Sequence, residues 1–242
     1  MIHICVRRTL DWNDEALVDA QVIPEFRGKL LAWNAAFDMP YHVFRQRLKA
    51  IAQENLARVE GCVRTELEAV PPGDVIVPVD DDDWFAPDLG LRLRRALDPK
   101  ARGYLWRREV IEAPPLWRRA RALLARLTGR RELHVCKTNN YAVVNGPVAL
   151  DLARHHAEAS AFFDAHPGDI RAVPATLAVQ NRNLASQTAL AWGRPSIGRD
   201  ELLAVFRRYR RFYRSVRLGV GLSWATPYVA QMADLMQEIR PR

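Results

Sequence analysis

The sequence predicts an α/β fold in which a mixed, mostly parallel sheet is flanked by helices and the C-terminal part is helical. Segments with the composition of strands alternate with segments of helical periodicity along most of the chain, which is the pattern of a sheet covered by helices. The composition, 49% hydrophobic and 26% charged over 242 residues, fits a globular chain with a sizeable core and excludes the disordered and coiled-coil classes. We therefore expect a single domain over residues 1–242.

Five segments rich in β-branched residues predict strands: 2–6, 74–79, 102–111, 134–145 and a short one within 171–183. Helical periodicity predicts helices over residues 41–69, 88–97, 114–131, 146–165 and 199–217. The run from Val75 to Val79 is apolar at every position, as expected for a strand in the interior of a sheet.

The charge balance favours anionic partners. Lys and Arg number 36 against 28 Asp and Glu, which gives a net charge of +8 and a field that attracts nucleotides, nucleic acid or acidic membranes. The three cysteines form no CxxC pair or zinc spacing, so buried, reduced thiols are expected. No signal peptide and no apolar stretch long enough to span a membrane is evident, which predicts a cytoplasmic protein.

Four consecutive carboxylates, Asp80 to Asp83, directly follow the Val75–Val79 run. In open α/β sheets ligands bind beyond the carboxyl ends of strands, and crowded carboxylates stay ionised together when a cation compensates them. Mg²⁺ or Mn²⁺ is the natural cation for oxygen ligands. The alternative is a solvated acidic loop that caps the next helix; four aspartates in a basic chain favour the metal.

The segment GDVIVPVDDDDWFAPDL, residues 73–89, resembles the metal-binding DxD region of GT-A type glycosyltransferases, especially the family-2-like group. The matching residues are Gly73, Asp74, Asp80, Asp82, Asp83, Trp84, Pro87 and Leu89. The resemblance implies a GT-A-like domain with a nucleotide-sugar-binding half over residues 1–100 and an acceptor half over residues 101–242.

The resemblance also implies a reaction and its metal. A sugar would pass from a nucleotide-diphosphate donor to a hydroxyl of a glycan, lipid-linked or small-molecule acceptor. Asp80 and Asp82 would hold Mn²⁺ or Mg²⁺, which stabilises the charge of the leaving diphosphate. Asp81 would lie with Asp80 at the donor, and Asp83 would support the metal or the sugar during catalysis.

Further site residues follow from position. The donor would contact Arg7, Arg8 and Thr9 after the first strand, Asp38 as the base-recognition acid, and Asn183, Ser186 and Thr188 in the late polar segment.

The family's acidic catalytic motif is absent in its usual form. The candidates for the catalytic base are Glu158, Asp164 and Asp169, each of which also suits a surface or capping position. Lys137, Asn139 and Asn140 would face the acceptor. His155 and His156 could suggest a metal site, but adjacent side chains on a helix point about 100° apart and cannot easily bind one ion. We therefore expect both on a helix surface.

The basic amphipathic segments 114–131 and 207–217 carry arginines interleaved with aromatic or apolar residues. A solvated basic face explains each of them alone. Together they favour peripheral association with an anionic membrane, while a phosphate backbone would suit them equally well.

Two other functions remain possible. One is another metal-dependent nucleotide-processing enzyme, a nucleotidyltransferase or a phosphohydrolase, although the first strand is followed neither by a Gly-rich phosphate loop nor by an Asp-x-Asp-x-Thr nucleophile. The other is a basic nucleic-acid-binding protein, which leaves the four aspartates unexplained because they would repel phosphates.

Overall fold

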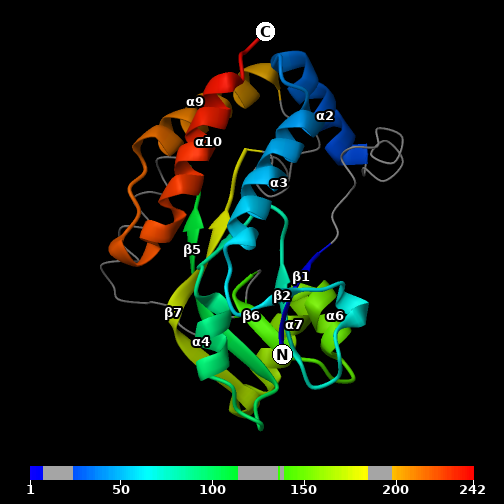
Figure 1. The fold of residues 1–242 in the computed structure, drawn as a ribbon. Coiled ribbons are helices and arrows are strands. Elements are labelled where there is room, and N and C mark those ends of the chain that lie inside the picture. The colour runs from blue at the N-terminus through cyan, green and yellow to red at the C-terminus, as the bar shows by residue number, and fades with distance from the viewer. Residues whose placement is uncertain (8–23, 114–135, 137–138, 185–197) are drawn as a thin grey trace. The chain divides into compact units, whose positions relative to one another are not determined.

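The computed structural model describes residues 1–7, 24–113, 136, 139–184 and 198–242 (Figure 1). The chain divides into two compact units. Unit 1 comprises Met1–Arg8, Asn55–Glu109 and Pro114–Gln180, and unit 2 comprises Thr9–Glu54, Val110–Ala113 and Asn181–Arg242. Both units are built from separate stretches of sequence. The division into a nucleotide-sugar-binding half over residues 1–100 and an acceptor half over residues 101–242 stays a prediction.

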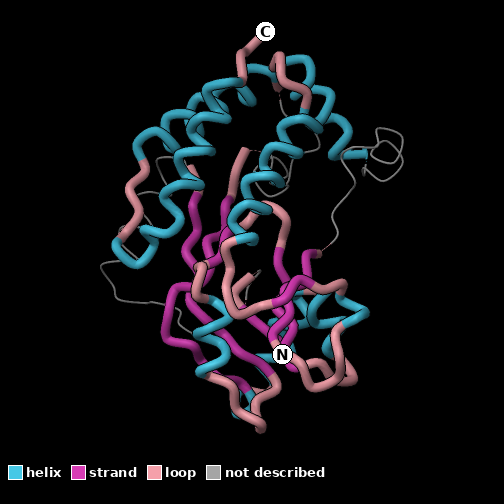
Figure 2. Tube along the Cα trace, in the orientation of Figure 1, coloured by secondary structure: helices cyan, strands magenta, loops and turns pink. Residues whose placement is uncertain are grey.

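Unit 1 is built on a seven-stranded sheet with the order β2-β1-β3-β6-β5-β7-β4. Figure 2 draws the strands in magenta and the helices in cyan. The strands are β1 Ile2–Val6, β2 Val63–Arg64, β3 Val75–Val79, β4 Trp84–Phe85, β5 Gly103–Ile111, β6 Tyr141–Val144 and β7 Ile170–Asn181. The last residues of β5 and β7 belong to unit 2. The α/β class and the mixed sheet are confirmed.

The strand directions give a mixed sheet in which most strands point the same way, as the sequence predicts. β1 pairs in parallel with β2 and β3, whereas β6 runs antiparallel to both β3 and β5, and β4 runs antiparallel to β7. β5 points the same way as β3, because both run antiparallel to β6. Arg102 bonds to Asp169 where β5 and β7 begin and Arg182 bonds to Ile111 where they end, so β7 runs parallel to β5.

Helices α6 (Ala149–Arg154) and α7 (His156–Ala165) cover one face of this sheet. Their apolar residues form one buried cluster with side chains of β1, β3, β5 and β6. The opposite face of β1 and β3 is also buried, and helix α4 (Leu89–Arg95) contacts β1. Burial on both sides explains why all five residues of β3 are buried, as expected for a strand inside a sheet.

The helix expected over residues 41–69 ends early. Helix α3 spans Tyr41–Ala57, and β2 and the 3₁₀ turn η1 (Leu67–Ala69) follow. Gly61 has φ +74, a left-handed conformation that other residues rarely adopt, and it lies against Gly90 of α4. A Cβ on Gly90 would meet the Glu60 carbonyl oxygen at 2.5 Å. The chain therefore turns at Gly61 and packs on α4, although the apolar spacing continues beyond it.

Two other predicted elements are shorter than expected. In the segment 134–145 the strand begins only at Tyr141, because Asn139 has φ 66 and a strand cannot contain that conformation. The single helix expected over 146–165 is two helices, because His155 has extended backbone angles between them. The basic segment 114–131 lies outside the described residues.

Unit 2 contains helices α2 (Pro24–Ala36), α9 (Arg199–Ser215) and α10 (Thr226–Glu238), most of α3, and the 3₁₀ turn η3 (Val220–Ala225). Buried aromatic rings join them: Trp33 stacks on Phe44 at 4.9 Å between centroids, and Phe37 packs on Phe206 of α9 at 4.8 Å. No helix in the described ranges is long and apolar enough to cross a membrane.

Candidate functional site

The four aspartates occupy the turn between β3 and β4 in unit 1. Pro78 precedes them and has no N–H to give to a neighbouring strand. The pairing of β3 with β6 involves only Val75 and Ile76, so β6 does not continue alongside the end of β3. The pairing of β3 with β1 continues to Val79, whereas on the β6 side of that end, side-chain hydrogen bonds fix the turn.

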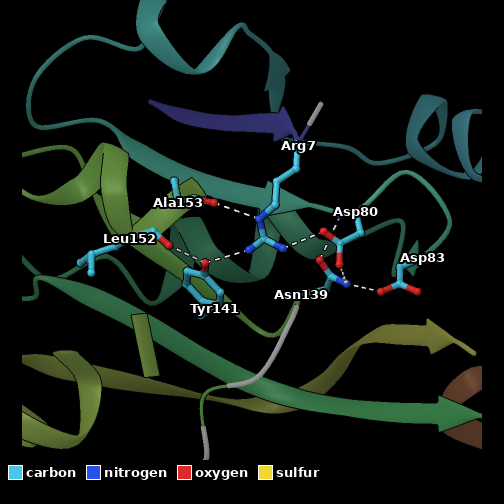
Figure 3. A network of polar contacts seen from close by, with 7 residues as sticks. All are labelled: Arg7, Asp80, Asp83, Asn139, Tyr141, Leu152 and Ala153. Carbon is cyan, nitrogen blue, oxygen red and sulfur yellow. Dashed lines mark hydrogen bonds and ion pairs between the residues drawn. The ribbon is translucent and has the colours of Figure 1, made fainter. Parts of the chain in front are cut away.

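Arg7 fixes one side of the turn. Its Nη1 donates to Oδ1 of Asp80 at 2.7 Å, its Nη2 to the Tyr141 hydroxyl at 2.8 Å and its Nε to the Ala153 carbonyl at 2.9 Å (Figure 3). Burial lowers the pKa of the Arg7 guanidinium, but the charge of Asp80 and the hydrogen bonds outweigh burial and the pKa is raised. Asp80 therefore has a permanent positive partner at the end of β1.

Tyr141 supports Arg7 from β6. Its hydroxyl accepts from Arg7 and donates to the Leu152 carbonyl at 2.6 Å (Figure 3). Burial raises the pKa of Tyr141 to about 12, so the hydroxyl stays protonated and able to donate at neutral pH. The guanidinium is thus held by a phenol and a helix carbonyl as well as by a carboxylate.

Asn139 fixes the other side. Its Oδ1 accepts the backbone N–H of Asp80 at 3.0 Å, and its Nδ2 donates to Oδ2 of Asp80 at 3.0 Å and to Oδ2 of Asp83. One amide group thus holds two carboxylates together (Figure 3). Asn139 is fully buried and is the one described residue other than glycine with a positive φ.

The turn is also held downstream, where Asn55 exchanges two side-chain hydrogen bonds with the backbone of Phe85 in β4, at 2.9 and 2.7 Å. Trp84 and Phe85 are fully buried and pair with β7. The aspartates therefore lie between two anchored strands, and Asp81 and Asp83 are only 5% and 2% exposed.

The number of carboxylates in the turn limits the kind of metal site that it could form. Within the described ranges no group of three or more His, Cys, Asp or Glu side chains could hold a metal ion, so a complete protein cage is absent there. Asp80 and Asp82 remain partly exposed, and one or two carboxylates with substrate phosphates form the usual Mg²⁺ shell. The turn fits a metal that arrives with a phosphorylated substrate.

A cavity of about 450 Å³ lies at the carboxyl ends of β1 and β2, within the size range of small-ligand pockets. Its charged and polar lining comprises Arg7, Glu66, Glu68, Arg154 and His155. Arg7 also contacts the aspartate turn, so one guanidinium adjoins both the cavity and Asp80. Arg154 donates to Glu68 at 2.9 Å across the lining.

Other expected donor-binding residues lie apart from this turn or outside the described residues. Asp38 belongs to unit 2, where its carboxylate accepts from the backbone N–H of Arg240 at 2.8 Å. Asn183 is buried in unit 2 and donates to the Asn181 carbonyl at 3.0 Å. Residues outside the described ranges are Arg8, Thr9, Lys137, Ser186 and Thr188.

The three candidates for the catalytic base are not gathered at the aspartates. Asp169 accepts from the backbone N–H of Arg102, next to the pairing of β6 with the first residue of β3. Because β3 is about 16 Å long at roughly 3.3 Å per residue, Asp169 is at the opposite end of that strand from Asp80. Glu158 and Asp164 are exposed on α7. These placements correct the expectation that Asp169 serves the cluster.

His155 is exposed as expected, but it does not lie within a helix. It separates α6 from α7 and lines the cavity, because its extended backbone interrupts the helix. His166 stacks on Phe162 at 4.5 Å between ring centroids.

Comparison of the chain with protein-family models, with curated proteins and with solved structures finds no match. The residues of the site therefore carry the functional argument alone.

Sequence reasoning placed Asn139 with the acceptor and did not single out Glu66 or Tyr141. A signal for Asn139 exists in retrospect, since Asn is among the few residues that tolerate a left-handed backbone before a strand. Glu66 follows a strand of two residues, which is too short for a periodicity to reveal.

Proposed function

We propose that this chain is a metal-dependent glycosyltransferase that moves a sugar from a nucleotide-diphosphate donor to a hydroxyl acceptor. The observation that carries the proposal is the anchored Asp80–Asp83 turn at the end of buried β3, joined through Arg7 to a cavity of about 450 Å³. The resemblance of residues 73–89 to the DxD region suggests the reaction class. We propose, as part of the same function, that the fold is of the GT-A type.

Asp80 and Asp82 would hold Mg²⁺ or Mn²⁺ together with the donor diphosphate. Bound there, the metal would neutralise the negative charge that develops on the leaving nucleoside diphosphate. The carboxylates need a fixed orientation for this role, and Arg7 and Asn139 provide it through the hydrogen bonds to Asp80 and Asp83. The chain's own contribution is therefore a preorganised acidic turn.

The cavity would receive the nucleoside. Glu66 follows β2, which lies in parallel beside β1, and it lines the same cavity as Arg7. This position suits the acidic base-recognition residue that the resemblance implies, and it makes Glu66 a better candidate than Asp38. Arg154 and His155 line the cavity as well and would face the donor's phosphates.

The reaction breaks the bond between the anomeric carbon and the diphosphate oxygen, which leaves with the bonding pair. The acceptor oxygen forms the new bond to that carbon, and its proton passes to a base or to the leaving phosphate. Asp83 is the catalytic candidate that lies in the aspartate turn itself. Its burial and its hydrogen bond from Asn139 suit a fixed orientation toward metal or sugar.

The deciding experiment is calorimetric titration with UDP, GDP, CDP and dTDP, with and without Mn²⁺. It compares the wild type with Asp82→Ala and with the control Asp88→Ala, which removes an exposed carboxylate of the same segment that pairs only along α4 with Arg92. Metal-dependent binding of one nucleotide, lost in Asp82→Ala and retained in Asp88→Ala, supports the proposal. Absence of binding, or equal binding by Asp82→Ala, overturns it.

Product analysis separates the transferase from other nucleotide-processing enzymes. Incubation with the sugar derivative of the bound nucleotide should release an intact nucleoside diphosphate, because the broken bond is the one to the sugar. A nucleotidyltransferase or phosphohydrolase would cleave the phosphoanhydride or a phosphate ester. Release of nucleoside monophosphate would therefore favour that alternative while keeping the metal site.

A further inference from the structure

Helix α9 of unit 2 carries a line of arginines on its exposed side. Arg207, Arg211 and Arg214 are exposed and follow one another at spacings of four and three residues, which places them on one face of a helix. Arg210 and Arg217 lie beside this line and are half-buried and exposed respectively. We call these five arginines the α9 arginine face. The four within the helix span about 10 Å at 1.5 Å per residue, and Arg217 follows just after the helix ends at Ser215.

The other side of α9 is committed to the core of unit 2. Leu202, Leu203, Phe206, Tyr209 and Tyr213 are buried. Phe206 packs on Phe37, and the Tyr213 hydroxyl donates to Asn181 at 2.6 Å. These contacts fix the rotation of the helix about its axis, so the arginines face outward as a consequence of packing.

The α9 arginine face has no counter-charge in the described part of the chain. None of its five arginines forms an ion pair with a carboxylate there, whereas Arg92 of α4 pairs with Asp88 and Arg154 of α6 with Glu68. The acidic residues of α9, Asp200 and Glu201, lie in its first turn. Within the described residues, the positive charge of this face is therefore not compensated by a carboxylate.

Helix stability does not explain this arrangement. Like charges at spacings of three and four residues destabilise a helix, and the α9 arginine face contains several such pairs. The helix dipole favours cations only in the last turn, which holds Arg214. An anionic partner would offset the repulsion, and arginine binds phosphate oxygens through two parallel hydrogen bonds.

We infer that the α9 arginine face docks this protein on the anionic headgroups of a lipid membrane. Phe206, Tyr209 and Tyr213 are turned into the core, and Phe212 is half-buried and packs on Tyr213 at 5.4 Å between ring centroids. Helix α9 therefore presents no row of exposed aromatic rings that could stack on the bases of a single-stranded nucleic acid. No large apolar side chain of α9 is exposed for insertion among acyl chains. The contact is therefore electrostatic, lies at the phosphate level and weakens with salt.

The test is co-sedimentation of the full chain with vesicles of phosphatidylcholine alone and with vesicles of equal parts phosphatidylcholine and phosphatidylserine. The wild type should bind only the anionic vesicles. The variant Arg207→Gln/Arg211→Gln/Arg214→Gln should bind them about a hundredfold more weakly, at about fivefold for each arginine removed. A matched control, Arg92→Gln/Arg94→Gln/Arg95→Gln on α4, lowers the net charge equally and should bind nearly as the wild type does.

Circular dichroism verifies that both variants are folded. If the α9 variant is not folded, a salt titration of the wild type replaces it. The inference then predicts that sodium chloride releases the bound protein from the anionic vesicles. Equal loss in the two triple variants, or binding to neutral vesicles, overturns the inference. Binding of the wild type to a duplex or single-stranded oligonucleotide but not to anionic vesicles overturns it in favour of nucleic acid. Nucleotide binding should be unchanged in the α9 variant, so this result is independent of the proposed function.

Discussion

Nη1 of Arg7 lies 2.7 Å from Oδ1 of Asp80, with the two side chains 13% and 26% exposed. This ion pair joins the end of β1 to the turn after β3, two strands that already pair in parallel. It neutralises one of the four consecutive aspartates from within the chain. Arg7 therefore stabilises the turn through one oxygen of Asp80, while the other oxygen accepts from Asn139 at 3.0 Å.

Removing both members of this pair should destabilise the protein by less than the sum of the two single effects. Arg7→Met leaves Asp80 without its cation and should cost about 3 kcal/mol of unfolding free energy, because an unpaired, largely buried charge is poorly solvated. The double variant Arg7→Met/Asp80→Asn should be more stable than the sum of the single effects predicts, by about 1–2 kcal/mol. Urea unfolding of the four proteins measures this coupling.

The control cycle uses Arg92→Met and Asp88→Asn. That pair has a distance of 2.6 Å, but both side chains are more than 40% exposed, so solvent screens it and a coupling of about 0.5 kcal/mol or less is expected. Equal coupling in the two cycles would contradict the view that burial gives the Arg7–Asp80 pair its strength.

Asn139 should contribute through both its side chain and its backbone. Asn139→Gly keeps the left-handed backbone at φ 66 but removes the hydrogen bonds to Asp80 and Asp83, and should cost about 2 kcal/mol because buried Asp83 loses a partner. Asn139→Ala removes the same bonds and also strains the backbone, which adds about 1 kcal/mol. Thermal or urea unfolding should rank the wild type above Asn139→Gly and Asn139→Ala last.

Metal-dependent nucleotide binding distinguishes the two contributions of Asn139. Both variants lose the amide that orients the carboxylates, so both should bind the nucleotide more weakly by about tenfold, the equivalent of one hydrogen bond of about 1.4 kcal/mol. Wild-type affinity in Asn139→Gly would show that the amide serves stability alone.

The sequence predicted the strands β1, β3, β5 and β7 and the acidic turn, because each is encoded by a local pattern of apolar residues and a change to charge. It could not predict the hydrogen bonds from Asn139 to the turn, since Asn139 and Asp80 are 59 residues apart. These bonds also depend on where the pairing of β6 with β3 ends. The end of α3 was missed for a similar reason: the close approach of Gly61 to Gly90 is a tertiary contact that overrides the local periodicity.

Glu66 should determine which nucleotide binds in the cavity. Glu66→Gln replaces a charged carboxylate, which only accepts hydrogen bonds, by a neutral amide with one acceptor oxygen and one donor nitrogen. Because an N–H of the nucleotide base would lose a charged acceptor, binding of the preferred nucleoside diphosphate should weaken about tenfold or more. Calorimetry with the four nucleoside diphosphates measures both affinity and preference.

The control for Glu66 is Glu68→Gln, which changes a second carboxylate of the same cavity that Arg154 engages at 2.9 Å. Its preference among the four nucleotides should remain that of the wild type. An unchanged preference in Glu66→Gln, or the same loss in both variants, would remove Glu66 from the base-recognition role. Loss of preference in Asp38→Asn would return that role to the residue favoured by sequence alone.

Cys5 should be protected from alkylation in the folded protein and should make stability depend on pH above 9. Burial, followed by the negative charges of Glu66 and Glu68, raises the pKa of the Cys5 thiol from 9.0 to about 12. At pH 8 the folded thiolate fraction is then about a thousandfold lower than in the unfolded chain, and only the thiolate reacts. Mass spectrometry after iodoacetamide treatment, with and without urea, measures the difference.

The same shift sets the sign of the pH effect. Because the folded state holds its proton more tightly, the stability from Cys5 is complete below pH 9 and decreases as the pH rises from about 9 toward 12. The variant Cys5→Ala cannot lose this proton, so its unfolding free energy should depend less on pH over that range. Rapid native labelling of Cys5, or equal pH dependence in both proteins, would show that the thiol at the end of β1 is accessible and that the edge of the cavity is open to solvent.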